Sequence, residues 1–292
     1  MNGVSVVIVN RNSLECLSAA MELLPRSFSG HFSRIIVVDN ASTESVHPLK
    51  KRFPNIYWIF NDRNLGFSHA VNQAVAEIGN DDILLLNPDA FLHEGSVGIL
   101  KAYLDANPSV GIVGPRILNS DGTLQLSCRR SIPTPWVSFT RLSGLSRLWP
   151  KSRLFSRYNL THTDPDATQK VGSVSGSCML VRREAWRKLA GFDERFFLFG
   201  EDLDFCLRAR QAGYDVIYHP KACVTHLKGV SCLNGDWPLS RYHFHRSMWV
   251  FYKKHFSPRL RPWDGIIWAG IWFRYLIEKM TKHPPAFSMK HE

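Results

Sequence analysis

Two acidic side chains each follow an apolar run typical of a buried strand. Asp39 comes directly after Arg34–Val38, and Asp89 follows Leu84–Leu86 after an Asn-Pro dipeptide. A carboxylate at Asp39 can accept hydrogen bonds from a nucleobase or a ribose. One at Asp89 suits Mg²⁺ or Mn²⁺, itself bound to a diphosphate. The structural alternatives are an Asx turn at Asp39 and a proline turn at Asp89.

Three further acids stand together in the segment Gly200-Glu201-Asp202-Leu203-Asp204. They open a predicted helix, and capping of its positive N-terminus is one interpretation of them. The preceding run, Phe196–Phe199, is apolar, and a carboxyl group beside it loses solvation, which raises its pKa toward the range of a general base. Asp202 and Glu201 are therefore candidate catalytic residues. His226 ends another apolar run; alone it is structural, but beside a metal at Asp89 it becomes a candidate ligand.

The elements that must position these residues are visible as alternating patterns in the first part of the chain. Short apolar runs predict strands at 4–9, 34–38, 56–60, 82–86 and 110–113, separated by helical patterns at 14–24, 66–78 and 95–107. Strands that alternate with helices predict an α/β fold with a mostly parallel central sheet flanked by helices. Because ligands bind at the carboxyl edge of such sheets, we expect Asp39 and Asp89 at that edge.

The remainder of the chain carries less regular patterns. Residues 133–166 lack clear periodicity and predict a long loop or a short helical insertion, and the basic segment 122–166 that contains them is placed to receive an acceptor. Beyond it we expect strands at 171–182, 215–218 and 222–225, and helices at 201–212, 240–256 and 263–280. The sequence thus predicts one nucleotide-binding domain over 1–230 and a C-terminal helical segment over 231–292.

Seven short motifs follow one another along the chain: Ser5–Asn12, Val37–Ser42, Asn64–Phe67 with Asn72, Asn87–Asp89, Gly176–Leu180, Gly191–Glu194 and Glu201-Asp202. In this order they resemble glycosyltransferase family 2, which has the GT-A fold. The resemblance covers Val4 to His226, about three quarters of the chain, and the Asn-Leu-Gly-Phe and Asn-Pro-Asp forms are most similar to the rhamnosyltransferase-like branch.

The resemblance implies a role for each matching residue. Asp202 would be the catalytic base with Glu201 beside it, and Asp89 and His226 would hold Mg²⁺ or Mn²⁺. The donor, a nucleoside-diphosphate sugar, would be bound by Asn10, Arg11, Asp39, Asn64, Gly66, Asn72 and Asp89. The reaction implied is inverting transfer of a sugar, with rhamnose as a candidate, to a hydroxyl of a saccharide acceptor in cell-surface polysaccharide synthesis.

Two positions depart from the usual family pattern. Arg11 stands where relatives usually carry an aromatic residue, although a guanidinium can also stack on a base. The motif at Asp89 offers one acid where many relatives have two, which predicts a modest metal affinity.

The charge balance indicates a polyanionic partner. Lys and Arg number 36 against 25 Asp and Glu, and no acid occurs from Gly122 to Thr163. No nucleic-acid-binding module is recognisable, so nucleic acid is not expected. The tail after Ser240 joins basic residues to a Trp-rich helix, a combination that favours binding to an anionic membrane surface. Packing of this helix on the core is the alternative.

The segment that comes nearest to a membrane span, Gly265–Phe273, is about half of the ~20 apolar residues required. The six cysteines form no C-x-x-C pair, as expected for reduced thiols of a cytosolic protein. The N-terminus shows no signal-peptide pattern. We therefore expect a cytoplasmic protein, peripheral on the inner face of the cell membrane, with a lipid-linked acceptor.

Two other functions fit an α/β core. A sugar-nucleotide nucleotidyltransferase usually has a Gly-rich phosphate loop after its first strand, and Asn10–Ser13 contains no glycine. A non-catalytic carbohydrate-binding protein has no need of Asp39, Asp89 and Asp202 together.

Overall fold

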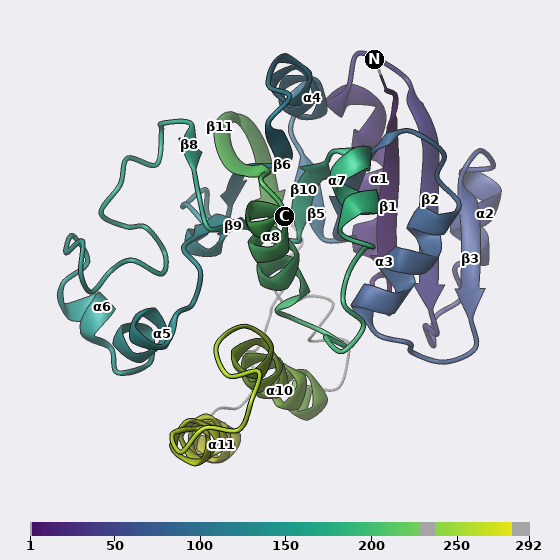
Figure 1. Cartoon of the computed structure of the whole chain (residues 1–292). Helices are drawn as coiled ribbons and strands as arrows, with labels where there is room; N and C mark the ends of the chain where they lie inside the picture. Colours follow the sequence, from purple (N-terminus) through teal and green to yellow (C-terminus); the bar gives the residue numbers. More distant parts are fainter. Residues whose placement is uncertain (1, 228–236, 282–292) are drawn as a thin grey trace.

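The computed structural model describes residues 2–227 and 237–281, and within these ranges the main sheet has nine strands (Figure 1). They are β1 (Val4–Asn10), β2 (Phe32–Asn40), β3 (Tyr57–Asn61), β4 (Asp82–Leu86), β5 (Ala90–Leu92), β6 (Val110–Leu118), β8 (Gln169–Lys170), β10 (Cys178–Val181) and β11 (Asp215–His226). Their order across the sheet is β3-β2-β1-β4-β10-β6-β11-β5, with β8 paired to β11.

Helices cover both faces of this sheet, which makes the domain a three-layer α/β structure. They are α1 (Leu14–Ser27), α2 (His47–Arg52), α3 (Phe67–Ala76), α4 (Ser96–Ala106), α7 (Arg183–Lys188) and α8 (Glu201–Gln211). One core lies between the sheet and α3, α7 and α8, and the other between the sheet and α1, α2 and α4. Adjacent residues such as Val7 and Ile8 point into opposite cores, as the strand period of two requires. The α/β prediction is confirmed.

The strands that end near the predicted site run parallel. β1 pairs with β2 and with β4 in parallel, so the carboxyl ends of all three meet at one edge of the sheet. Asn10 and Asp39 are partners in the β1–β2 register. β10 lies between β4 and β6 and runs antiparallel to both. The strands expected at 171–182 are β10 and the short β9 (Ser173–Val174) that precedes it.

Two strands were predicted at 215–218 and 222–225. This prediction was wrong, because both ranges belong to one strand. β11 is continuous, and its register with β6 shifts between His219 and Cys223. Pro220 lies in this interval, and because proline lacks an N–H donor, the ladder is interrupted while the chain remains extended. The far end of β11 pairs with the three-residue β5, which the sequence did not predict because it is so short.

Residues 122–166 form the predicted short helical insertion. It contains a 3₁₀ turn (Leu126–Cys128), β7 (Arg129–Arg130), α5 (Pro135–Leu142) and α6 (Leu145–Leu148). β7 pairs with β9 and returns the chain to the domain, while α5 and α6 extend away from the sheet (Figure 1).

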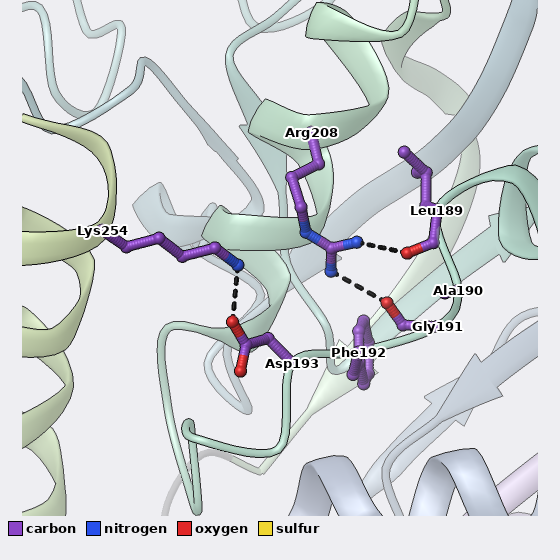
Figure 2. A pocket seen from close by; sticks show the side chains of 7 residues that line it. All are labelled: Leu189, Ala190, Gly191, Phe192, Asp193, Arg208 and Lys254. Atoms are coloured by element: carbon purple, nitrogen blue, oxygen red, sulfur yellow. Dashed lines mark hydrogen bonds and ion pairs between the residues drawn. The ribbon is translucent and has the colours of Figure 1, made fainter. Parts of the chain in front are cut away.

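Two C-terminal helices, α10 (Trp237–His255) and α11 (Asp264–Thr281), lie below the sheet in the view of Figure 1. Figure 2 shows Lys254 of α10 reaching Asp193, at 2.6 Å, beside a hollow where α10, α8 and the loop after α7 meet. Lys254 also lies 2.6 Å from Asp204 of α8, and Phe251 packs with Phe196. Both helices were predicted; the division into 1–230 and 231–292 stays a prediction, and residues 228–236 and 282–292 lie outside the described ranges.

The described helices were also considered as membrane spans. In the ranges that the structure covers, no helix combines the length and the apolar character that crossing a bilayer requires.

Candidate active site

Asp39, at the end of β2, is held by its neighbours on β1 and in the following turn. Its carboxylate accepts hydrogen bonds from Asn10 Nδ2 at 2.9 Å and from Ser42 Oγ at 2.6 Å. Ser42 Oγ in turn accepts from the backbone N–H of Asn12 at 3.0 Å. Asn10 is the register partner of Asp39, so the pairing of β1 with β2 alone brings these two side chains together. Asp39 is therefore fixed at the carboxyl edge of the sheet.

Asn40, which the sequence reading missed, organises the loop that leads into α3. Its Nδ2 donates to Asn64 Oδ1 at 2.9 Å, and its Oδ1 accepts from Leu65 N at 3.1 Å. Asn64 Oδ1 also accepts from Gly66 N at 3.0 Å. Gly66 has φ +86°, and a Cβ added to it would lie 2.7 Å from the carbonyl oxygen of Phe197. Only glycine permits this close approach between α3 and the segment that precedes α8.

Arg11 and Asn72, two of the predicted donor-binding residues, have different surroundings. The Nε of Arg11 is buried and has no hydrogen-bond partner among the described residues. Asn72 is engaged elsewhere: it donates to Phe192 O and Glu194 Oε1, and it accepts from Phe192 N, each at 2.9 Å. Asn72 thus ties α3 to the loop after α7. Its contact with a donor stays a prediction.

Asp89 and His226 are brought together by the pairing of β5 with β11. His226 is opposite Ala90 in that register, and its Nε2 lies 3.2 Å from Asp89 Oδ1. The other ring nitrogen, Nδ1, lies 3.0 Å from Gln125 Oε1. Asp89 and His226 are both buried. A hydrogen bond from Nδ1–H to Gln125 leaves the Nε2 lone pair directed toward Asp89.

Asp89 Oδ1 and His226 Nε2 are spaced like two ligand atoms in adjacent coordination positions around a divalent cation. Two ligand atoms at right angles around an ion, each about 2.1 Å from it, are about 3 Å apart, close to the observed separation. The described part of the chain contains no group of three or more His, Cys, Asp or Glu side chains placed to hold a metal. The remaining ligands would therefore come from the donor diphosphate and water, as is usual for Mg²⁺.

Asp202, in the first turn of α8, is held by residues from two other segments. Its Oδ2 accepts from Arg130 Nη2 at 2.7 Å and from Gly176 N at 2.9 Å, and its Oδ1 accepts from Leu203 N at 2.7 Å. A Cβ added to Gly176 would lie 3.2 Å from Asp202 Cβ, so the loop approaches closely. A carboxylate has about four acceptor sites, and these bonds use three of them. One lone pair, on Oδ1, remains for a proton.

Arg130 of β7 supplies the positive charge beside Asp202. Its Nη2 also donates to Val174 O at 2.7 Å, so β9 fixes the position of the guanidinium. Burial by itself would lower the pKa of Arg130, but the charges of Asp202 and Tyr158 and the hydrogen bond to Asp202 together outweigh it and raise this pKa. Arg130 therefore stays charged, and its guanidinium group forms a buried ion pair with Asp202.

Glu201 lies beside Asp202 but has the opposite environment. It is buried, and its Oε2 has no hydrogen-bond partner among the described residues. Burial, followed by the charge of Asp202, raises the pKa of Glu201 to about 8. Glu201 therefore holds its proton more tightly than a carboxyl group in water does, and it lies next to the ion pair of Asp202 with Arg130.

One loop connects the acid pair to the turn that carries Asp89. Gly176 N binds Asp202, and the carbonyl of the next residue, Ser177, accepts from Asn87 N at 2.8 Å. Asn87 begins the turn that ends at Asp89. The Gly176-Ser177 peptide thus links the candidate base to the candidate metal site.

The comparisons with known proteins agree with this geometry. The chain matches a family model described as Glycosyltransferase like family 2 over residues 2–241. The chain belongs to glycosyltransferase family 2. This membership confirms the resemblance drawn from the seven motifs, and it decides against the nucleotidyltransferase and non-catalytic alternatives.

Curated relatives within family 2 include two rhamnosyltransferases. N-acetylglucosaminyl-diphospho-decaprenol L-rhamnosyltransferase of Mycobacterium tuberculosis is 32% identical over 230 residues, covering 74% of this chain and 73% of that protein. Rhamnosyltransferase WbbL of Escherichia coli is 25% identical over 227 residues, covering 74% of this chain and 80% of its own. The similarity to the rhamnosyltransferase branch is therefore confirmed.

Comparison with solved structures confirms that this chain has the GT-A fold. The mannosyltransferase PcManGT from Pyrobaculum calidifontis, solved with GDP-Man and Mn²⁺, superposes with a TM-score of 0.58 at 16% identity, covering 97% of this chain and 76% of that one. S. aureus TarS 1–349 superposes with a TM-score of 0.57 at 13% identity, covering 95% and 82%.

Proposed function

We propose that this family 2 enzyme is an inverting, metal-dependent glycosyltransferase. The observation that carries the proposal is the arrangement of Asp202: a buried carboxylate paired with Arg130, with one free lone pair, and joined to the turn bearing Asp89 by hydrogen bonds to Gly176 and Ser177. A single displacement needs one base and one site for the leaving diphosphate, and this arrangement supplies both.

The donor is a nucleoside-diphosphate sugar bound at the carboxyl edge of the sheet. Asp39 accepts hydrogen bonds from the nucleoside, and Arg11, with its buried and unpartnered Nε, stacks on or bonds to the base. Asn64 and Gly66 shape the neighbouring loop. Asp89 and His226 would hold a divalent cation, Mg²⁺ or Mn²⁺, and this cation would offset the negative charge that develops on the diphosphate.

The reaction is balanced by one proton transfer. The acceptor oxygen attacks C1 of the sugar from the face opposite the diphosphate, the bond from C1 to the diphosphate breaks, and Asp202 takes the hydroxyl proton. The nucleoside diphosphate leaves with its electron pair. One displacement inverts the configuration at C1. Glu201, which holds its proton more tightly than a carboxyl group in water does, would leave the negative charge of the acid pair on Asp202.

The transferred sugar and the acceptor follow from the relatives. We infer rhamnose as the sugar and a lipid-linked saccharide as the acceptor, because the mycobacterial relative is a rhamnosyltransferase whose name specifies N-acetylglucosaminyl-diphospho-decaprenol. The product would enter cell-surface polysaccharide. We place the enzyme on an anionic membrane at its cytoplasmic face; the described cysteines are all free thiols, as is usual in a reducing compartment.

The test is release of nucleoside diphosphate from a panel of donors, including a nucleoside-diphosphate rhamnose, with lipid-linked N-acetylglucosamine as acceptor. EDTA should abolish release, and Mn²⁺ or Mg²⁺ should restore it. Asp89→Ala should weaken metal-dependent donor binding by roughly 10–100-fold. Full activity in EDTA would contradict the metal site, and an NMR spectrum showing retained configuration at C1 would contradict the single displacement.

A further inference from the structure

Helix α11 buries its two acids and exposes most of its large apolar side chains. Asp264 and Glu278 are 4% and 9% exposed, whereas Ile266 and Phe273 are each 66% exposed and Met280 is 86% exposed. Ile271 is buried, and Trp272 packs against Tyr242 of α10. An amphipathic surface helix normally buries the apolar stripe, so this outer stripe requires a partner.

The polar inner face of α11 is bound to α10, which explains why the helix cannot simply turn over. Asp264 accepts from Lys253 Nζ at 2.7 Å and from Tyr252 Oη at 2.9 Å. Glu278 pairs with Arg241 at 3.1 Å. Turning the helix would break these buried pairs and leave their charges without partners. The outward position of the apolar stripe is thus set by specific contacts with α10.

A second group of exposed apolar side chains lies on the α5–α6 insertion. Trp136 and Phe139 on α5 are 44% and 55% exposed, Leu148 at the end of α6 is 69% exposed, and Trp149 follows it at 51%. Trp136 and Trp149 both pack against Phe155, which holds the group together as one cluster.

The two apolar groups belong to one side of the molecule. Arg274 of α11 donates from Nη1 to the carbonyl oxygen of Leu142, the last residue of α5, at 3.1 Å. Figure 1 shows α5, α6 and α11 projecting from the same end of the molecule, away from the sheet. We call this combined surface the α5–α11 face.

The charges around this face have one sign. Exposed Arg147, Lys151 and Arg153 flank the α5–α6 cluster, and Arg259 and Arg261 precede α11. No acid occurs from 122 to 163, and both acids of α11 are buried in ion pairs. A surface that is apolar at its centre and cationic at its rim complements anionic lipid headgroups over an acyl boundary.

We propose that the α5–α11 face binds the surface of an anionic bilayer, with α11 and the α5–α6 insertion inserting side by side. Two copies of the face would bring like charges together, which disfavours self-association. The inference deepens the proposed function, since it specifies where a lipid-linked acceptor meets the enzyme. α10 connects α11 to the segment before the base: Arg241 of α10 pairs with Glu278 of α11, and Ser247 of α10 donates to Leu198 O at 3.1 Å.

The proposal is tested by co-sedimentation of the full chain with vesicles of phosphatidylcholine containing phosphatidylglycerol, against vesicles of phosphatidylcholine alone. We expect binding only to the anionic vesicles, and loss of binding at high salt. Phe273→Ser on α11 and Trp149→Ser on the insertion should each weaken binding about tenfold or more, because each removes a large inserted side chain. Lys151→Glu should weaken it severalfold.

The matched control is Phe60→Ser, which removes a ring that is 46% exposed on β3, the edge strand that Figure 1 shows on the opposite side of the molecule from α5 and α6. It should leave vesicle binding unchanged, and thermal melting should show that all variants are folded. If Trp149→Ser binds like the unmodified protein, the insertion is not part of the face and the two-part proposal is overturned. Absence of binding, or concentration-dependent dimerisation that Phe273→Ser abolishes, overturns it entirely.

The proposed sugar transfer is measured separately from vesicle binding. Release of nucleoside diphosphate with a short-chain, water-dispersed acceptor should be the same for Phe273→Ser, Trp149→Ser and the unmodified protein. Vesicle binding without any such release would contradict the proposed function and leave the lipid-binding face intact. Release without vesicle binding would do the reverse.

Discussion

Asp39 and Asp202 lie in opposite halves of the site and are held by different kinds of neighbour. Asp39, in what we call the donor half, is bonded to Asn10 on the adjacent strand and to Ser42 three residues along the chain. Asp202, in the base half, is paired with Arg130, 72 residues away. Strand order builds the first half, whereas a buried ion pair between distant segments builds the second.

This difference has an energetic consequence. The neutral partners of Asp39 can be replaced at the cost of individual hydrogen bonds, about 1 kcal/mol each. Removing one member of the Arg130–Asp202 pair leaves a buried charge without compensation, which costs about 3–5 kcal/mol. The base half should therefore be more sensitive to substitution, both in rate and in stability.

The largest effect is expected for Asp202→Asn. The amide cannot take the acceptor proton, so kcat should fall by ~10²–10⁴-fold while the donor Kd changes little. Stopped assays of nucleoside-diphosphate release and donor titration calorimetry measure the two quantities. Retention of more than half of the original kcat would remove Asp202 from the role of base.

A smaller and different effect is expected for Asp39→Ala. Loss of the nucleoside contact should raise the KM for the donor by roughly 10-fold, with kcat less affected, because the interaction is made in both ground and transition states. Ser42→Ala, which removes a hydrogen-bond partner of Asp39 and of Asn12 but leaves the Asp39 carboxylate in place, is the matched control and should change KM less. An unchanged donor KM for Asp39→Ala would show that the donor half is elsewhere.

Arg130→Gln tests the effect of the positive charge that is paired with Asp202 in the base half. Without the guanidinium, protons bind the acid pair more tightly, so the acidic limb of the kcat/KM profile should move to higher pH by about 1 unit. Arg130→Lys should restore part of the original profile. A uniform loss of rate with no shift of the limb would mean that Arg130 only supports the fold.

A pH-dependent effect is expected in the stability of Glu201→Gln. The pKa of Glu201 is raised from 4.5 to about 8 by folding, so the folded protein binds this proton more tightly than the unfolded chain does. Stability from this group is present below pH 4.5 and is lost as the pH rises toward 8. Chemical denaturation between pH 5 and 8 should show a downward slope that Glu201→Gln lessens. Identical slopes for both proteins would contradict a protonated Glu201.

The donor half and the base half also differ in how far they could be predicted from the sequence. The strands ending at Asn10, Asp39 and Leu86 are apolar runs of ordinary length, and parallel order places their ends together. The donor half and the carboxyl edge were therefore predictable. β5 was not, because three residues carry no period, and the pairing that aligns Asp89 with His226 depends on it.

The supporting residues of the base half left no local signal. Arg130 resembles the other basic residues of the segment 122–166, and only the folded chain shows it buried. Gln125 binds His226 across 101 residues. Long-range partners of this kind can be found only when the topology is known.

The pairing of β5 with β11 also has a consequence for the order in which the protein is made. Asp89 and His226 are separated by 137 residues. At a synthesis rate of ~5–20 residues per second, the ribosome needs on the order of ten seconds to add them. During that interval the strands of the donor half have emerged, while α8 and the end of β11 have not. A nascent chain thus carries the proposed donor half before it carries the proposed base.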